Sequence, residues 1–162
     1  MVARDPSAEL MRLVYGYRVS QAIHVVATLG IADLLKAGPR SAADLASATN
    51  SHTKTLYRVL RALAAVGVFR EEADQHFSLA PMGQCLRSDA KRPVGPYATF
   101  IGRPHHWQAW GDLLHSTRTG ENAFRHVHRE TVGMDVNELR HKVRVRPVRG
   151  RMQLHLDWAS YG

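Results

Sequence analysis

Histidines are the residues whose number and spacing first suggest chemistry in this sequence. The chain has ten of them, including the adjacent pair His105-His106 and the pair His126-x-His128. A metal site needs several ligands that converge on one point, and histidines usually share that role with carboxylates or thiolates. The sequence has no HExxH motif and no cysteine pair, and residues 126–128 fall in an expected loop. We therefore predict no metal site and interpret these histidines as solvated or hydrogen-bonding side chains.

Covalent catalysis and nucleotide binding find less support still. Cys85 is the single cysteine, so an intramolecular disulfide is excluded and a reducing, cytoplasmic setting is expected. We expect Cys85 to be a small core residue of an amphipathic helix, because no patterned His or Asn partner would activate it. Neither GxSxG, GxxxxGK[ST] nor GxGxxG after a strand is present. The sequence predicts no catalytic and no cofactor-binding residue in this chain.

Composition is typical of a soluble globular protein. The chain has 162 residues, of which 44% are hydrophobic and 22% are charged, and this length is sufficient for one domain with a real core. The N-terminal segment carries Asp5 and Glu9 and does not resemble a signal peptide. The most apolar stretch, residues 22–35, is too short to span a bilayer and contains His24 and Asp33. We expect no membrane association.

Apolar residues at helical spacing predict several helices in the first 65 residues. A short helix contains Leu10, Leu13 and Val14, and a longer one has its apolar face at positions 19, 22, 23, 26 and 27. A short helix follows at 31–35. The next helix is predicted to begin at Ser41, which is followed three residues later by Asp44, and another is predicted to be capped by Ser51.

A predicted β-hairpin follows these helices. Gly67 is expected to end the helix that starts after Ser51, residues 68–71 and 76–80 read as strands, and residues 72–75 read as the turn between them. Helical segments are expected again at about 93–101 and from Pro104 onward, with Trp107, Trp110, Leu113 and Leu114 on one face. The predicted fold is mostly α: a winged helix-turn-helix with a small β-hairpin wing and additional N- and C-terminal helices.

The positive charge leaves a DNA-binding function open. The formal net charge is +8, and a winged helix can place its second helix in the major groove, where the basic and polar residues at 51–61 could contact phosphates and bases. Part of the charge lies in a basic stretch that contains Lys142, Arg144, Arg146, Arg149 and Arg151. The alternative function is therefore a small winged-helix transcriptional regulator.

Several phrases resemble the N-terminal part of the plant-type and hydroxyneurosporene-type O-methyltransferases, which use S-adenosylmethionine. The phrases are Val19-Ser-Gln-Ala-Ile-His24, Leu29-Gly-Ile-Ala-Asp-Leu-Leu35, Asp44-Leu45-Ala46, Leu56-Tyr-Arg-Val-Leu-Arg-Ala-Leu63, Val66-Gly-Val-Phe69, Phe77-Ser-Leu-Ala-Pro-Met-Gly83 with Leu86, Trp110 to Leu114, and Thr117-Arg-Thr-Gly120 with Ala123-Phe124. The resemblance runs from about Leu10 to His128 in the family's order and spacing.

The resemblance implies a dimerisation role in place of DNA reading. In this family the winged helix builds an intertwined homodimer and forms one wall of the acceptor pocket, against a flat phenolic or polyketide-like substrate. The positions that match this wall are Phe100, His106, Trp107 and Trp110. The alternative for Trp107 and Trp110, which lie three positions apart on a helix, is that they are core residues. The expected partners are a second copy of the chain and a small aromatic ligand, and nucleic acid is not expected.

The resemblance ends after residue 128. Relatives continue into a donor domain, where a glycine-rich loop and an acid hold S-adenosylmethionine and a later histidine acts as base, and nothing here matches these motifs. We expect residues 1–128 to be the winged-helix dimerisation domain and residues 129–162 to be a basic irregular tail. Truncation or frame disruption of a longer enzyme is one explanation, and a genuine tail is the other. Without the donor domain, the chain is expected to be inactive in methyl transfer.

Overall fold

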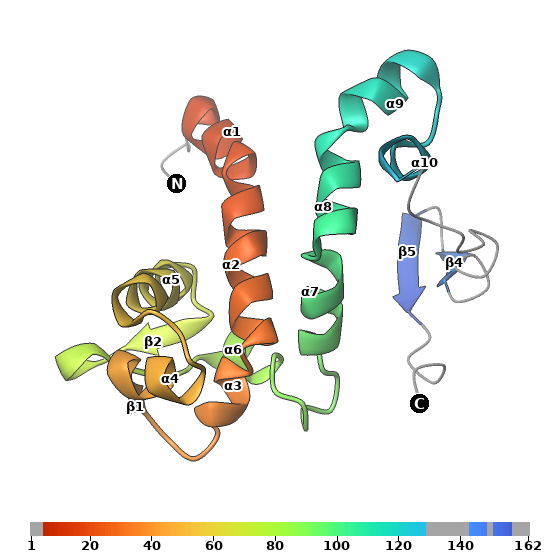
Figure 1. The fold of residues 1–162 in the computed structure, drawn as a ribbon. Coiled ribbons are helices and arrows are strands. Elements are labelled where there is room, and N and C mark those ends of the chain that lie inside the picture. The colour runs from red at the N-terminus through yellow and green to blue at the C-terminus, as the bar shows by residue number, and fades with distance from the viewer. Residues whose placement is uncertain (1–4, 129–142, 149–150, 157–162) are drawn as a thin grey trace. The chain divides into compact units, whose positions relative to one another are not determined.

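The computed structural model describes residues 5–128, 143–148 and 151–156 (Figure 1). These residues belong to two compact units, residues 1–107 and residues 108–162, and each is described by itself. In the described part of the chain, no helix has the length and apolar character needed to cross a membrane. The predicted domain boundary after residue 128 reflects family resemblance and not compactness, and it stays a prediction.

Unit 1 opens with three helices, as the apolar periodicity predicts. They are α1 (Pro6–Val14), α2 (Gly16–Thr28) and α3 (Ile31–Leu34). Asp5 caps α1 by accepting a hydrogen bond from the backbone N–H of Ser7 at 3.1 Å. Gly30 separates α2 from α3 with a φ of 66°, which glycine adopts at no steric cost. Within unit 1, α1 continues from the end of α2 that lies away from α3 (Figure 1).

The helix-turn-helix consists of α4 (Ala42–Ala48) and α5 (Thr53–Ala65). The Oγ of Ser41 accepts a hydrogen bond from the N–H of Asp44 at 3.0 Å, so the predicted cap of α4 is confirmed. The predicted cap of α5 by Ser51 is wrong. His52 is the N-cap residue, while the Ser51 hydroxyl donates back to the carbonyl of Thr49 at 3.4 Å. Local hydrogen bonding within the turn thus competes with capping for this hydroxyl.

The wing is a three-stranded antiparallel sheet of order β1-β3-β2, formed by β1 (Arg40–Ser41), β2 (Phe69–Glu71) and β3 (His76–Leu79). The predicted hairpin is confirmed to within one residue, with the short 3-10 helix η1 (Ala73–Gln75) as its turn. Phe77 of β3 pairs with Arg40 on one side and with Glu71 on the other. The strand β1 was not predicted, because two residues are too few for an alternating pattern. The predicted mostly α winged helix is confirmed.

The core of unit 1 lies where α2 to α5 meet the sheet. Its largest fully buried side chains come from the wing (Phe69 and Phe77), from α5 (Leu60 and Leu63), from α4 (Leu45), from α3 (Ile31) and from α2 (Val26). The helical members of this set are apolar positions that the helical spacing places on one face of each helix. Burial of each such side chain stabilises the fold by about 1.5–3 kcal/mol.

A second packing layer in unit 1 joins α2 to α7. The chain passes through α6 (Pro81–Gln84) and α7 (Gly95–Ile101) to the start of α8 (Pro104–Gly111). Nδ1 of His24 lies 3.1 Å from the carbonyl oxygen of Ala98, which confirms hydrogen bonding for this histidine. The ring of His24 also occupies the space that a Cβ at Gly102 would need, so a side chain at position 102 would collide with it. Glycine thus permits the close approach of the segment after α7 to α2.

Unit 2 contains α9 (Leu113–Thr119), α10 (Ala123–Val127), β4 (Val143–Val148) and β5 (Arg151–Leu156). The strands β4 and β5 pair antiparallel, with Val143 opposite Leu156 and Val148 opposite Arg151. The prediction that residues 129–162 are irregular is therefore wrong for these two segments. The alternation of valine and arginine at 143–146 is the strand signal that was missed.

Candidate functional site

Phe100 and His106 are the two predicted pocket residues that lie in direct contact. Phe100 lies in the last turn of α7, one residue before its end, and His106 lies in the first turn of α8. Their ring centroids are 4.1 Å apart and the planes are inclined by 58°. Phe100 is 37% exposed, so the pair presents aromatic edges at the surface of unit 1.

Trp107 contacts an aromatic residue of α2 that was not predicted. The centroids of Trp107 and Tyr17 are 6.3 Å apart with an interplanar angle of 44°, which is within the range of aromatic pairing. Trp107 is half-buried, so it is not a core residue. Tyr17 was overlooked because it lies some ninety positions upstream, and only the packing of α2 on α7 brings the two together.

Trp110 belongs to unit 2, whereas the other three predicted residues belong to unit 1. Its side chain is 64% exposed, so the core alternative is wrong for this tryptophan. The prediction of one continuous face from Trp107 to Leu114 is also wrong. The helix α8 ends at Gly111, and Asp112 is the N-cap of a separate helix, α9. A role for these four residues in ligand binding stays a prediction.

The helix α1 and the first turn of α2 carry an exposed apolar surface in unit 1. We call it the α1 face and define it as Leu10, Leu13, Val14 and Tyr17. These four side chains are 51 to 65% exposed, and the neighbouring Tyr15 is 42% exposed. The helix α1 itself contributes no buried residue. Arg18 borders the face, with its guanidinium 4.4 Å from the ring centroid of Tyr15 and its Nε 3.1 Å from the Tyr17 hydroxyl.

The second helix of the helix-turn-helix is tied to the wing by its own polar residues. The hydroxyl of Tyr57 donates a hydrogen bond to Oε1 of Glu71 at 2.8 Å, and this bond, together with burial, raises the pKa of Tyr57. Nε of Arg61 lies 3.7 Å from Oε2 of the same carboxylate. Glu71 thus pairs with one of the basic residues that a DNA-contacting helix would direct at phosphates.

Cys85 is exposed, so the prediction of a core cysteine is wrong. It is the C-cap residue of the four-residue helix α6, which is too short to have a buried face along its length. The Sγ lies 3.8 Å from the carbonyl oxygen of Pro81. Among the residues that the structure describes, no histidine is hydrogen-bonded to this thiol, so the geometry supplies no activating base.

Comparison with known proteins identifies the family to which the N-terminal part of the chain belongs. The family model described as the O-methyltransferase dimerisation domain matches residues 11–89, which comprise the last part of α1 through the wing and α6. The mitomycin biosynthesis 6-O-methyltransferase of Streptomyces lavendulae is 46% identical over 65% of this chain. The 8-amino-8-demethylriboflavin N,N-dimethyltransferase of Streptomyces davaonensis is 45% identical over 70% of it.

Solved structures agree with the sequence matches. The crystal structure of the dimethyltransferase RosA from Streptomyces davawensis superposes with a TM-score of 0.71 at 42% identity, over 78% of this chain and 38% of that one. The neocarzinostatin O-methyltransferase NcsB1, solved in complex with S-adenosyl-L-homocysteine, superposes with a TM-score of 0.63 at 33% identity, over 74% of this chain and 40% of that one.

The chain matches only part of the length of its relatives. The chain spans about a third of the length of these two curated relatives, 30% of the first and 33% of the second. The matched part includes the helix-turn-helix, the wing and most of the α1 face. Residues 11–89 of the chain are a dimerisation domain of the O-methyltransferase family.

Proposed function

We propose that unit 1 forms a homodimer through the α1 face and supplies the acceptor side of an O-methyltransferase-like protein. The observation that carries the proposal is that α1 has no buried residue although Leu10, Leu13 and Val14 lie along it. A nine-residue helix is marginal in water by itself, and most of the stability of such helices comes from packing of an apolar face. A second copy of the same helix can supply that packing in a self-complementary interface.

Hydrogen–deuterium exchange at two protein concentrations tests the dimer proposal. We expect the amides of α1 and of the first turns of α2 to be protected at high concentration and to exchange faster after dilution, because dissociation exposes the α1 face. The amides of α5, whose apolar side is buried within the chain, serve as the internal control and should not change. Exchange of α1 that is independent of concentration would contradict dimerisation through this helix.

Methyl transfer from S-adenosylmethionine to a hydroxyl of a small aromatic or polyketide-like molecule is the proposed parent reaction. The names of the relatives support it, since they are O-methyltransferases and an N,N-dimethyltransferase. The sequence carries no glycine-rich donor loop after a strand. Methyl transfer requires the sulfonium and the acceptor oxygen to be held in line at close range. We expect this chain alone to transfer no methyl group.

The predicted acceptor wall gives a second measurable expectation. If Phe100, His106 and Trp107 bind a flat aromatic ligand, titration with phenolic and polycyclic compounds quenches the intrinsic fluorescence saturably. The binding should be weak, because each aromatic pair contributes only about 0.5–1.5 kcal/mol. Trp107→Phe should diminish the quenching. A panel without any saturable response up to the solubility limit would contradict a ligand wall.

The DNA-binding alternative makes the opposite prediction in a mobility-shift experiment. We expect no tight, sequence-selective binding of mixed genomic fragments at moderate salt, because Glu71 engages Arg61 and Tyr57 of α5. A regulator would bind duplexes with an affinity that falls steeply as salt rises, since each neutralised phosphate releases counterions. Selective binding with that salt dependence would overturn the dimerisation proposal as the main function.

A further inference from the structure

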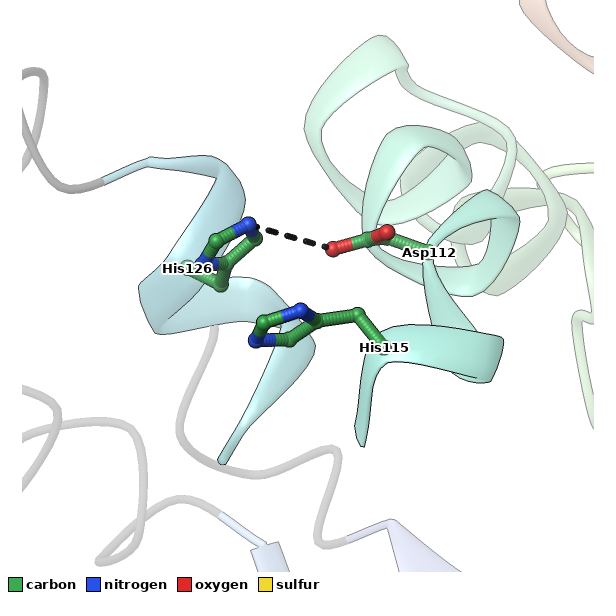
Figure 2. Close-up of side chains that lie close together, drawn as sticks. All are labelled: Asp112, His115 and His126. Carbon is green, nitrogen blue, oxygen red and sulfur yellow. Dashed lines mark ion pairs between the residues drawn. The ribbon is translucent and has the colours of Figure 1, made fainter. Parts of the chain in front are cut away.

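Unit 2 brings two carboxylates and two imidazoles together at one place. The cluster, which we call the 112–126 cluster, consists of Asp112, His115, Glu121 and His126, and all four are partly buried. One donor atom each of Asp112, His115 and His126 lies within 4.8 Å of the other two. Figure 2 shows the Asp112 carboxylate pointing toward His126, with the ring of His115 beside both.

Local chain geometry explains why residues fourteen positions apart meet. Asp112 is the N-cap of α9 and His115 lies one helical turn later, so both are on the same side of its first turn. Gly120 ends α9 with a φ of 75° and reverses the chain. Asn122 then caps α10 by accepting the N–H of Arg125 at 3.1 Å. The reversal places His126 of α10 against the first turn of α9.

Glu121 is hydrogen-bonded to His115 and lies beside the ring of His126. Its Oε2 lies 3.0 Å from Nε2 of His115 and 3.5 Å from Nδ1 of His126. An ionised carboxylate can only accept hydrogen bonds, so Nε2 of His115 carries the proton. When His115 is neutral, its Nδ1 therefore has a free lone pair. A carboxylate that fixes the tautomer of a histidine in this way is the usual outer partner of a metal-binding imidazole.

The remaining donor atoms lack hydrogen-bonding partners. Oδ2 of Asp112 and Nδ1 of His126 are both shielded from solvent without a hydrogen bond. Oδ2 lies 3.9 Å from Nε2 of His126, which is too long for a hydrogen bond. A buried polar atom without a partner costs about 1–3 kcal/mol. A bound cation would satisfy the open oxygen.

Charge favours a divalent ion over two protons. The rings of His115 and His126 stack with centroids 3.7 Å apart and planes inclined by only 16°, and two protonated rings would repel one another at this separation. Two carboxylates beside two neutral imidazoles carry a formal charge of −2. One divalent cation neutralises that charge without placing a proton on either stacked ring.

We propose that Asp112, His115 and His126 bind a divalent transition metal, for which Zn²⁺ is the probe, and that Glu121 is the positioning residue for His115. Two imidazoles and one carboxylate are a ligand set that Zn²⁺ accepts, with water or a further carboxylate oxygen completing four-coordination. Bond lengths of about 2.0–2.1 Å place tetrahedral donors roughly 3.3 Å apart. The three donor atoms lie within 4.8 Å of one another, so rotation of their side chains must bring them closer when the metal binds. The sequence-based prediction of no metal site did not consider this set.

Titration of the full, untagged and chelator-treated chain with Zn²⁺ tests the proposal. Calorimetry should give one tight site per chain, and Co²⁺ substitution should give the visible absorption of a four-coordinate ion. His126→Ala and Asp112→Asn should weaken binding more than about tenfold, and Glu121→Gln should weaken it about 10–100-fold through the orientation of His115. Asp112→Asn preserves the size and shape of the side chain, so it remains informative if a histidine variant fails to fold.

His105→Ala is the matched control, because it removes an exposed histidine from the adjacent pair 105–106 in the other unit. It should leave Zn²⁺ affinity and the Co²⁺ spectrum unchanged. Equal affinity of the native chain, His126→Ala and Asp112→Asn would overturn the proposal, as would loss of binding in His105→Ala. Absence of any tight Zn²⁺ site in the native chain would show that the cluster is an ion-pair network only.

Discussion

Phe77→Ala is expected to lower the free energy of unfolding of unit 1 by about 3–5 kcal/mol. Phe77 is fully buried on the middle strand of the wing, between β1 and β2. Its ring meets Tyr57 edge-on, with centroids 6.0 Å apart. Truncation removes this packing and leaves a cavity beneath α5. Urea unfolding followed by far-ultraviolet circular dichroism measures the change as a lowered midpoint.

Phe100→Ala is the control for residue type. Phe100 is already 37% exposed, so the same truncation should cost only about 1 kcal/mol. Comparable losses in the two variants would contradict the assignment of the core to the junction of the helix-turn-helix and the wing.

Leu13→Glu is expected to dissociate the proposed homodimer, with a dissociation constant raised at least about a hundredfold. Leu13 is 65% exposed on α1, and a two-fold interface contains each substituted residue twice. Burial of unpaired carboxylates costs several kcal/mol, while each tenfold change corresponds to about 1.4 kcal/mol. Sedimentation velocity over a concentration series measures the shift.

Val66→Glu is the matched control for that experiment. Val66 is 42% exposed at the C-terminal end of α5, outside the α1 face, so a carboxylate there should remain solvated. Its dissociation constant should match that of the native chain. If Leu13→Glu behaves like Val66→Glu, the dimer is formed by a different surface.

The fold of unit 1 was predictable from sequence because its signals are local. Apolar spacing gives α2 and α5, Ser41 with Asp44 gives the start of α4, and Gly67, with a φ of 81°, gives the end of α5. The wing followed from two strand patterns on either side of a polar turn. Each of these depends on a few neighbouring residues, so a single sequence suffices to find it.

The errors arise where tertiary contacts or competing hydrogen bonds decide. The hydroxyl of Ser51 donates a hydrogen bond to the carbonyl of Thr49 in the turn. The Ser51 side chain therefore does not cap α5. The apolar residues from Trp107 to Leu114 predicted one helical face, but the chain breaks at Asp112 into two separate helices. The sequence analysis did not group Asp112, His115 and Glu121 with His126, because only the reversal at Gly120 brings His126 back to α9.

The molar mass of the native chain in solution tests the central claim most directly. Sedimentation equilibrium at tens of micromolar, a range in which an obligate interface should persist, is predicted to give about twice the chain mass of 18.1 kDa. A single species of 18.1 kDa across that range would contradict dimerisation through the α1 face.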